Sequence, residues 1–312
     1  MGIHTKEVYV ICMQEFPLLV NVGEPPVTGI VSLGELKRHH ECQDVKIKDP
    51  EHGLFFVVDG APTGDGYFAA MKTAQTVTEI LGSQIDVELT TIAHSQKQDT
   101  SRHNELMESL VMSEMHRAIL EADQTLEMAA QLDEKKKHST ASIALAKLVL
   151  MPDHTHTLFY TNVGSTRLFL LRNRELTQMT DDDSFLTKEV LSGQITSEEA
   201  FQADQADTKD DVPHKAMFAY QHRNKLTRSV GALEEKEIQV KTELVFPGDR
   251  LVLTSHGLTD QLKQKIIQNR LNTIESDREA ERVLQQEADD MAVRGTDPRA
   301  KADDISVIIQ TI

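Results

Sequence analysis

Acidic and polar residues stand at the ends of apolar runs, beside glycine or close to it, in three places along the chain. The three sequences are VVDG at 57–60, TSHGL at 254–258 and KADDI at 301–305. Carboxylate oxygens are the ligands that Mg²⁺ and Mn²⁺ prefer, and glycine lets a backbone carbonyl approach a cation closely. Taken singly, each sequence is also an ordinary turn, because Asp-Gly is a common turn pair. A metal site is therefore expected only if the fold brings the three places together.

Other patterns that could support chemistry are weaker. HHEC at 39–42 and HTH at 154–156 contain zinc-ligand residue types, but no complementary pair at helical spacing accompanies either. GDG at 64–66 is too short to predict a nucleotide-binding phosphate loop. The two cysteines, Cys12 and Cys42, form no C-x-x-C motif, so we expect no disulfide framework and a reducing compartment.

Short apolar runs and long amphipathic segments interleave along the chain, which favours a mixed α and β fold. The apolar runs predict strands at 54–58, 141–150, 157–161, 167–171, 236–241, 250–254 and 305–312. Apolar spacings of three and four predict helices at 67–82, 102–132 and 277–293, with a short helix beginning at 197–200. The short gaps between the three strands after residue 140 favour an antiparallel meander rather than a parallel sheet.

The composition limits the class of protein further. The 312 residues carry 50 acids and 33 Lys or Arg, a net charge of −17, which argues against nucleic-acid binding through phosphate neutralisation. A hydrophobic content of 39% supports a folded core, and the absence of Trp makes it mainly aliphatic. No segment approaches the roughly 18 apolar residues of a membrane helix, and residues 1–16 lack a signal-peptide pattern. We expect one cytoplasmic domain over residues 1–312, without membrane contact.

Seven blocks of the sequence occur in an order that resembles the metal-dependent protein phosphatases, the PPM or type 2C serine/threonine phosphatases, and in particular their bacterial forms. The blocks are RHHECQD at 38–44, FFVVDGAPTGDG at 55–66, STASIALA at 139–146, TNVGSTRLFLL at 161–171, HRNKLTRSVG at 222–231, GDRLVLTSHGL at 248–258 and DDISVIIQTI at 303–312. The resemblance runs from about residue 29 to residue 312. The segment at about 184–222 resembles the flap of the bacterial enzymes.

The resemblance implies an α+β fold, a PPM-type αββα sandwich of two antiparallel β-sheets flanked by helices. It also implies divalent ions, Mn²⁺ or Mg²⁺, at one end of the sandwich, where they activate a water that attacks a phosphoprotein. The metal ligands that it implies are Asp59, the Gly60 carbonyl, Asp303, His256 and Asp44. A phosphate-binding arginine is expected near the first block, and Arg38 stands one residue from that position.

Several departures from the family pattern fall on these chemical positions. They are His256 for an Asp, Gln43 for an acidic ligand, Ser165 for a third-metal Asp, Ala61 for a His and Asp304 for an Asn. Imidazole suits Mn²⁺ or Zn²⁺ better than Mg²⁺, although His256 has a second interpretation as a residue that packs beside Asp59 and hydrogen-bonds it. Because adjacent divalent ions repel and carboxylates offset that repulsion, we expect a second ion to bind weakly, so that the site holds one ion or none.

Two functions of different classes follow from the residues and the resemblance. The first is a serine/threonine phosphatase with an altered, Mn²⁺-preferring metal centre and slow turnover. The second is a catalytically inactive pseudophosphatase that binds a phosphoprotein or a regulatory protein partner. Residues 177–211 hold ten acids and two bases, which contribute −8 of the −17 charge, and this acidity favours a basic partner.

Overall fold

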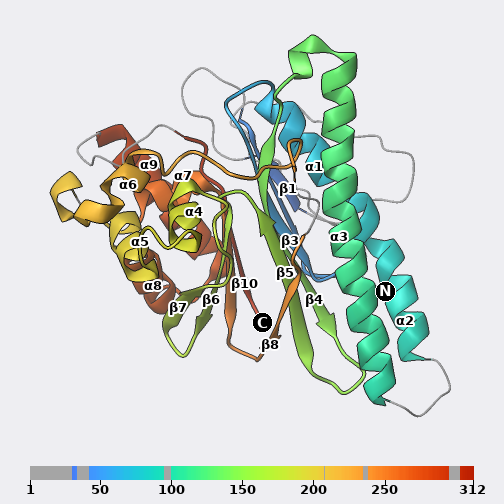
Figure 1. Ribbon diagram of the computed structural model, residues 1–312. Coiled ribbons are helices and arrows are strands. Elements are labelled where there is room, and N and C mark those ends of the chain that lie inside the picture. The colour runs from blue at the N-terminus through green and yellow to red at the C-terminus, as the bar shows by residue number, and fades with distance from the viewer. Residues whose placement is uncertain (1–29, 34–41, 95–99, 207, 235–237, 295–302) are drawn as a thin grey trace.

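Two antiparallel β-sheets form the centre of the protein, and helices cover their outer faces (Figure 1). The computed structural model describes residues 30–33, 42–94, 100–206, 208–234, 238–294 and 303–312. Within these residues the larger sheet has the order β1-β2-β3-β4-β5-β8, with bounds Ile30–Leu33, Asp44–Asp49, Leu54–Gly60, Ala141–Leu150, His156–Val163 and Lys241–Val245. The smaller sheet has the order β10-β9-β6-β7, with bounds Val307–Thr311, Arg250–Thr254, Arg167–Arg172 and Glu175–Gln178. The expected sandwich of two antiparallel sheets is confirmed.

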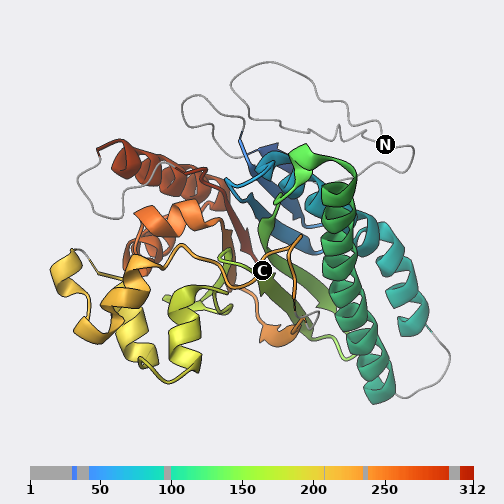
Figure 2. The same ribbon diagram turned by 45° about the horizontal axis from the view of Figure 1, so that its top comes forward.

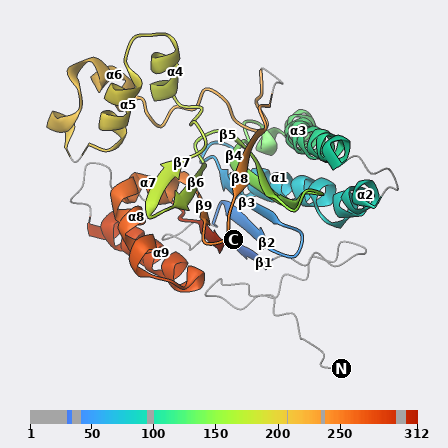
Figure 3. The same cartoon turned by 90° about the horizontal axis from the view of Figure 1, so that it is seen from below.

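Three layers of apolar side chains hold the sandwich together. One layer packs the larger sheet against α1 (Gly66–Leu81), α2 (Ser83–Ala93) and α3 (Thr100–Leu132). A second fills the space between the sheets, and a third packs the smaller sheet against α7 (His256–Gln261), α8 (Gln264–Thr273) and α9 (Asp277–Arg294). Figures 2 and 3 show the two helical layers on opposite sides of the sheets. None of the described helices is long and apolar enough to cross a membrane.

The start of α1 explains the GDG sequence at 64–66. A carboxylate oxygen of Asp65 accepts the backbone N–H of Phe68 at 2.9 Å, so Asp65 caps the helix, and Lys136 pairs with the same carboxylate. Gly60 lies so close to this helix start that a Cβ on it would be 2.1 Å from the carbonyl oxygen of Gly66. The two glycines therefore let the end of β3 reach the start of α1, and no phosphate loop is formed there.

The predicted meander is wrong in its third strand. β4 and β5 form an antiparallel pair as expected, but β6 pairs with β9 and β7 in the smaller sheet. Gly164, with φ +91°, packs against Ser142 and turns the chain from one sheet to the other. Both faces of β6 are buried, since Leu168 and Leu170 point between the sheets and Phe169 points towards the helices behind. A strand buried on both faces belongs inside a sheet, which short sequence gaps do not reveal.

The predicted strand at 236–241 is also wrong, because β8 begins at Lys241. Residues 238–240 are irregular, and 236–237 lie outside the described residues. Ile238 packs into the apolar core that the larger sheet shares with α3. The hydroxyl of Thr161 donates a hydrogen bond to the carbonyl of Gln239 at 2.8 Å. The apolar residue is thus used for packing rather than for pairing with a neighbouring strand. The other predicted strands and helices are confirmed within a few residues at their ends.

Residues 184–222, called the flap below, form a small helical group between β7 and β8. It contains α4 (Phe185–Leu191), α5 (Ser197–Asp204) and α6 (Met217–Gln221), which pack around their own apolar cluster (Figure 3). The buried guanidinium of Arg167 on β6 pairs with Asp204 of α5 at 3.0 Å and with Asp182 at 2.6 Å. Burial alone would lower the pKa of Arg167, but the two carboxylates outweigh it and raise that pKa well above its usual value. The arginine therefore stays charged and ties the flap to the smaller sheet.

Candidate metal centre

Two aspartates face each other at the end of the larger sheet. Asp44 begins β2 and lies opposite Asp59 of β3 in the antiparallel register. Asp44 is 1% exposed, and neither of its carboxylate oxygens accepts a hydrogen bond. The hydroxyl of Ser306 lies near it but lacks hydrogen-bond geometry, and it is itself buried without a partner. A buried carboxylate without donors is a costly arrangement, unless a ligand supplies the missing charge.

The segment before β10 brings two more carboxylates to the same place. A carboxylate oxygen of Asp304 accepts the backbone N–H of Gln43 at 2.7 Å, which fixes this segment beside the start of β2. Gly257 fixes its other side, because a Cβ there would be 2.0 Å from the carbonyl oxygen of Asp304. Burial first, and then the negative charges of Asp59, Asp304 and Asp303, raise the pKa of Asp44 well above its usual value. The four carboxylates therefore form one electrostatically coupled group.

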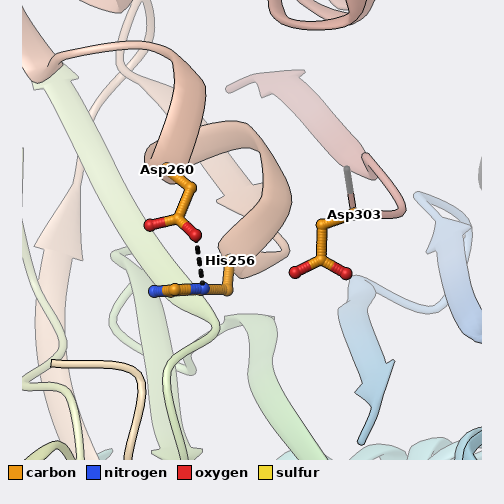
Figure 4. Close-up of side chains that lie close together, drawn as sticks. All are labelled: His256, Asp260 and Asp303. Atoms are coloured by element: carbon orange, nitrogen blue, oxygen red, sulfur yellow. Dashed lines mark ion pairs between the residues drawn. The ribbon is translucent and has the colours of Figure 1, made fainter. Parts of the chain in front are cut away.

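A second group of possible ligands lies at the start of α7 (Figure 4). His256 begins this helix, and its Nδ1 is 3.3 Å from a carboxylate oxygen of Asp260 one turn later. Ligand atoms of His256, Asp260 and Asp303 lie within 4.8 Å of one another. The backbone N–H of His256 donates to Asp59 at 3.2 Å, so α7 also touches the first group. Asp303 is shared between the two groups, which makes them parts of one site.

The structure brings together most of the residues that the sequence pointed to. Asp44, Asp59, Asp303 and His256 meet at one end of the sandwich, and Gly60 follows Asp59 at the end of β3. The proposed ligand role of each remains a prediction. Arg38, the predicted phosphate contact, lies outside the described residues, as does the neighbouring His39.

Asp260 was not identified from the sequence. It is 4% exposed and stands four residues after His256, so both side chains lie on one face of α7. That spacing was available in the sequence as a signal, because residues i and i+4 are neighbours on a helix. The site is therefore more acidic than the sequence reasoning assumed.

The structure also shows where two of the residues that depart from the family pattern lie. The side chain of Gln43 packs against the start of α1, since a Cβ on Gly66 would be 3.0 Å from its amide nitrogen. Ser165 is 7% exposed and lies in the turn between β5 and β6. Neither side chain adds a negative charge to the site.

The arrangement fits a divalent cation. The unpaired oxygens of Asp44 and the shared carboxylate of Asp303 are hard ligands, and their mutual repulsion is what a cation relieves. The imidazole of His256 adds a nitrogen ligand that Mn²⁺ accepts more readily than Mg²⁺ does. An oxygen-rich site with one imidazole is therefore chemically compatible with a divalent cation such as Mn²⁺.

Comparison with known proteins supports the same fold. No family model matches the chain. Protein phosphatase PhpP of Streptococcus pneumoniae is 30% identical over 103 residues, which are 33% of this chain and 35% of the relative. Serine/threonine protein phosphatase PstP of Mycobacterium tuberculosis is 28% identical over 199 residues, which are 60% of this chain and 33% of the relative. The chain therefore matches about a third of the length of these curated relatives.

Solved structures match over almost the whole chain. The Streptococcus agalactiae serine/threonine phosphatase has a TM-score of 0.62 at 19% identity, covering 91% of this chain and 98% of that one. The catalytic domain of PstP, solved with two manganese ions, has a TM-score of 0.57 at 19% identity, covering 90% of this chain and 95% of that one. The fold is that of the PPM serine/threonine phosphatases, and the resemblance seen in the sequence is confirmed at this level.

Proposed function

We propose that this protein is a metal-dependent phosphatase that removes phosphate from phosphoserine or phosphothreonine in proteins. The observation that carries the proposal is the buried carboxylate of Asp44, which has no hydrogen-bond donor and faces Asp59, Asp303 and Asp304. A protein does not retain such a repulsive group for stability, and a divalent cation is the ligand that offsets it. The phosphatase names of PhpP and PstP support the same reaction class.

The residues of the centre have distinct tasks in this proposal. Asp44, Asp59 and Asp303 hold a divalent cation, which supplies Lewis-acid stabilisation of the phosphoryl group and lowers the pKa of water. The backbone N–H of His256 orients Asp59 through its hydrogen bond. Asp260 lies 3.3 Å from Nδ1 of His256 and adds a further carboxylate to the centre. We further propose Mn²⁺ as the preferred ion, a weak second site, and a reducing cytoplasmic compartment.

One observation favours the second function, a pseudophosphatase that binds phosphoproteins or a regulatory partner without turnover. His256 and Gln43 replace carboxylates, and the Gln43 amide packs against Gly66. Two adjacent divalent ions need several carboxylates to offset their repulsion. A centre that held one ion would still bind a phosphoryl group but would lack the second ion that assists hydrolysis of the phosphoester.

Hydrolysis of para-nitrophenyl phosphate during a Mn²⁺ titration separates the two functions. The comparison uses the wild-type chain, an Asp59→Asn variant, and Asp290→Asn as a matched control on the exposed face of α9. Metal-dependent turnover that Asp59→Asn abolishes and Asp290→Asn preserves supports the phosphatase and excludes the pseudophosphatase. Calorimetry that detects no Mn²⁺ binding to the wild-type chain removes the basis of the enzymatic proposal.

A further inference from the structure

One stretch of the chain has the opposite charge to the rest of the protein. Residues 212–233 contain four Lys or Arg and two His but no Asp or Glu, in a protein of net charge −17. This stretch includes α6 and the loop that follows it. It directly follows the acidic residues 177–211, whose charge is −8. This sharp change in the sign of the charge at the flap gives two surfaces that prefer ligands of opposite charge.

Some of the acidic groups of the flap region form contacts within the protein. Asp182 and Asp204 pair with the buried Arg167. Glu199 and Asp211 accept backbone and hydroxyl hydrogen bonds in the capping boxes of their helices. The negative charge of residues 177–211 is therefore not all available to a partner, and the basic partner expected from the sequence stays a prediction.

Two rings of the basic stretch, Phe218 and His222, meet Phe185 of α4 in a partly exposed cluster. Phe185 of α4 meets Phe218 of α6 at 5.7 Å and the His222 ring at 5.6 Å, measured between ring centroids. Phe218 and His222 are 4.5 Å apart, and Phe218 is 60% exposed. Burial of one such ring against a partner stabilises a complex by about 2 kcal/mol. The cluster is therefore suited to cover an apolar side chain of a partner.

Three cationic residues lie on or next to the segments that carry these rings. Lys188 lies 5.8 Å from the centre of the Phe185 ring, and the carbonyl of Lys225 accepts the backbone N–H of Phe185 at 3.0 Å. Arg223 lies over the ring of Tyr220 at 4.3 Å. Across the described part of the chain, no carboxylate forms an ion pair with any of these three side chains. Unpaired cations beside exposed rings favour an acidic ligand that also carries an apolar group.

A chain of contacts connects this surface with the metal centre. Asp183, two residues before Phe185, accepts the backbone N–H of Gly164 at 3.0 Å and lies 3.6 Å from Arg228. Gly164 packs against Ser142, which lies opposite Asp59 in the sheet register. These contacts link the segment before α4 with the strand position opposite Asp59.

We propose that Phe185, Phe218, His222, Lys188, Arg223 and Lys225 form a docking surface for an acidic segment of a phosphoprotein. The acidic segment flanks the phosphorylated residue, its carboxylates meet the cations, and one apolar side chain covers the rings. This inference rests on the proposed phosphatase function and specifies its substrate class. Recognition on the flap is independent of the metal ion, so docking and turnover are separable.

Fluorescence anisotropy with the full chain in EDTA tests the docking directly. The probes are two labelled phosphothreonine peptides of equal length, one with Asp, Glu and Leu flanks and one with Lys, Arg and Leu flanks. We expect tighter binding of the acidic peptide, weakened by about tenfold in Lys188→Glu/Lys225→Glu and further weakened by salt. Lys209→Glu, another exposed flap lysine, is the matched control and leaves the affinity unchanged.

The outcomes separate docking from catalysis. Equal affinity of the double variant and the wild-type chain for the acidic peptide overturns the docking surface, as does a wild-type preference for the basic peptide. Phe218→Ser is a second variant, and it lowers affinity for both peptides because both carry leucine. If the wild-type chain binds the acidic peptide but never hydrolyses it with Mn²⁺, the proposed activity fails while the docking surface stands. Unchanged para-nitrophenyl phosphate turnover in the double variant shows that the metal centre is intact.

Discussion

Replacement of Asp44 by Asn is expected to stabilise the metal-free protein while it abolishes metal binding. Asp44 is 1% exposed, has no hydrogen-bond donor and lies opposite Asp59 across two strands. Residues at opposite positions have Cβ atoms about 5 Å apart, and two unit charges at that distance repel by about 3 kcal/mol at an effective dielectric constant near 20. Asparagine removes this charge and adds an amide that can donate to the neighbouring carboxylates.

Protonation limits the size of the expected effect. At pH 7 a carboxyl group of ordinary pKa 3.8 can take up a proton at a cost of about 4 kcal/mol, using 1.4 kcal/mol per pH unit. Wild-type Asp44 therefore lowers the free energy of unfolding by no more than about 4 kcal/mol. We expect the free energy of unfolding of Asp44→Asn in EDTA to be higher than that of the wild-type chain by about 2 to 4 kcal/mol.

Urea unfolding followed by circular dichroism measures this difference, with and without saturating Mn²⁺. Mn²⁺ is expected to raise the unfolding midpoint of the wild-type chain and to leave Asp44→Asn unchanged. Asp49→Asn is the matched control, because Asp49 is also a buried aspartate of β2 but is paired with His52 at 2.8 Å. The free energy of unfolding of Asp49→Asn in EDTA should not exceed that of the wild-type chain. A lower stability of Asp44→Asn than of wild type in EDTA would refute the reasoning that Asp44 is kept for a ligand.

Two further predictions concern the imidazole and the helix cap. His256→Asp should shift the relative affinity of the site towards Mg²⁺ by about tenfold, because it replaces a nitrogen ligand with an oxygen anion. Calorimetric titrations with Mg²⁺ and Mn²⁺ measure the ratio of the two affinities. An unchanged ratio means that His256 is not a ligand of the ion. Asp65→Ala should lower the free energy of unfolding at pH 7 by about 1 kcal/mol through loss of the α1 cap. Partial burial raises the pKa of Asp65, but the hydrogen bonds from Lys136 and Phe68 outweigh it and lower that pKa below 3.8. The contribution of the Asp65 carboxylate to stability is therefore complete above pH 3.8 and is lost as the pH falls through the lowered pKa of Asp65. Urea unfolding at decreasing pH should show the free energies of unfolding of the wild-type chain and of Asp65→Ala becoming equal.

The sequence predicted the elements that end at the metal centre better than it predicted how they are assembled. The apolar run before Asp59 and the terminal run after Asp304 are strands because their side chains are buried on both faces. That local signal is strong, whereas the assignment of β6 to the smaller sheet depends on packing between residues far apart in the chain. Ile238 shows the same limit, since an apolar residue in an irregular segment gives the same sequence signal as a strand residue.

The residues of the candidate site could be predicted where they stand next to the end of an apolar run in the sequence. Asp59, Asp303 and His256 were found from their positions beside strand ends, and the structure places them together. Asp260 was missed because it lies one helical turn inside α7 rather than at a strand end. The isolation of Asp44 was invisible in the sequence, since it follows from the absence of a donor among residues that only the fold brings near.

The attachment of the flap to the smaller sheet through the buried Arg167 has an evolutionary consequence. The flap has an apolar cluster of its own, separate from the layers that hold the two sheets and their helices together. Substitutions on its outer surface therefore leave the packing beneath the carboxylates unchanged, as long as Arg167 keeps Asp182 and Asp204 as partners. Under the proposed docking role, selection can alter partner preference at the flap while the strand ends stay fixed. Related proteins are accordingly expected to diverge fastest on α4 and α6, and a grafted flap that retains these three residues should carry its preference with it.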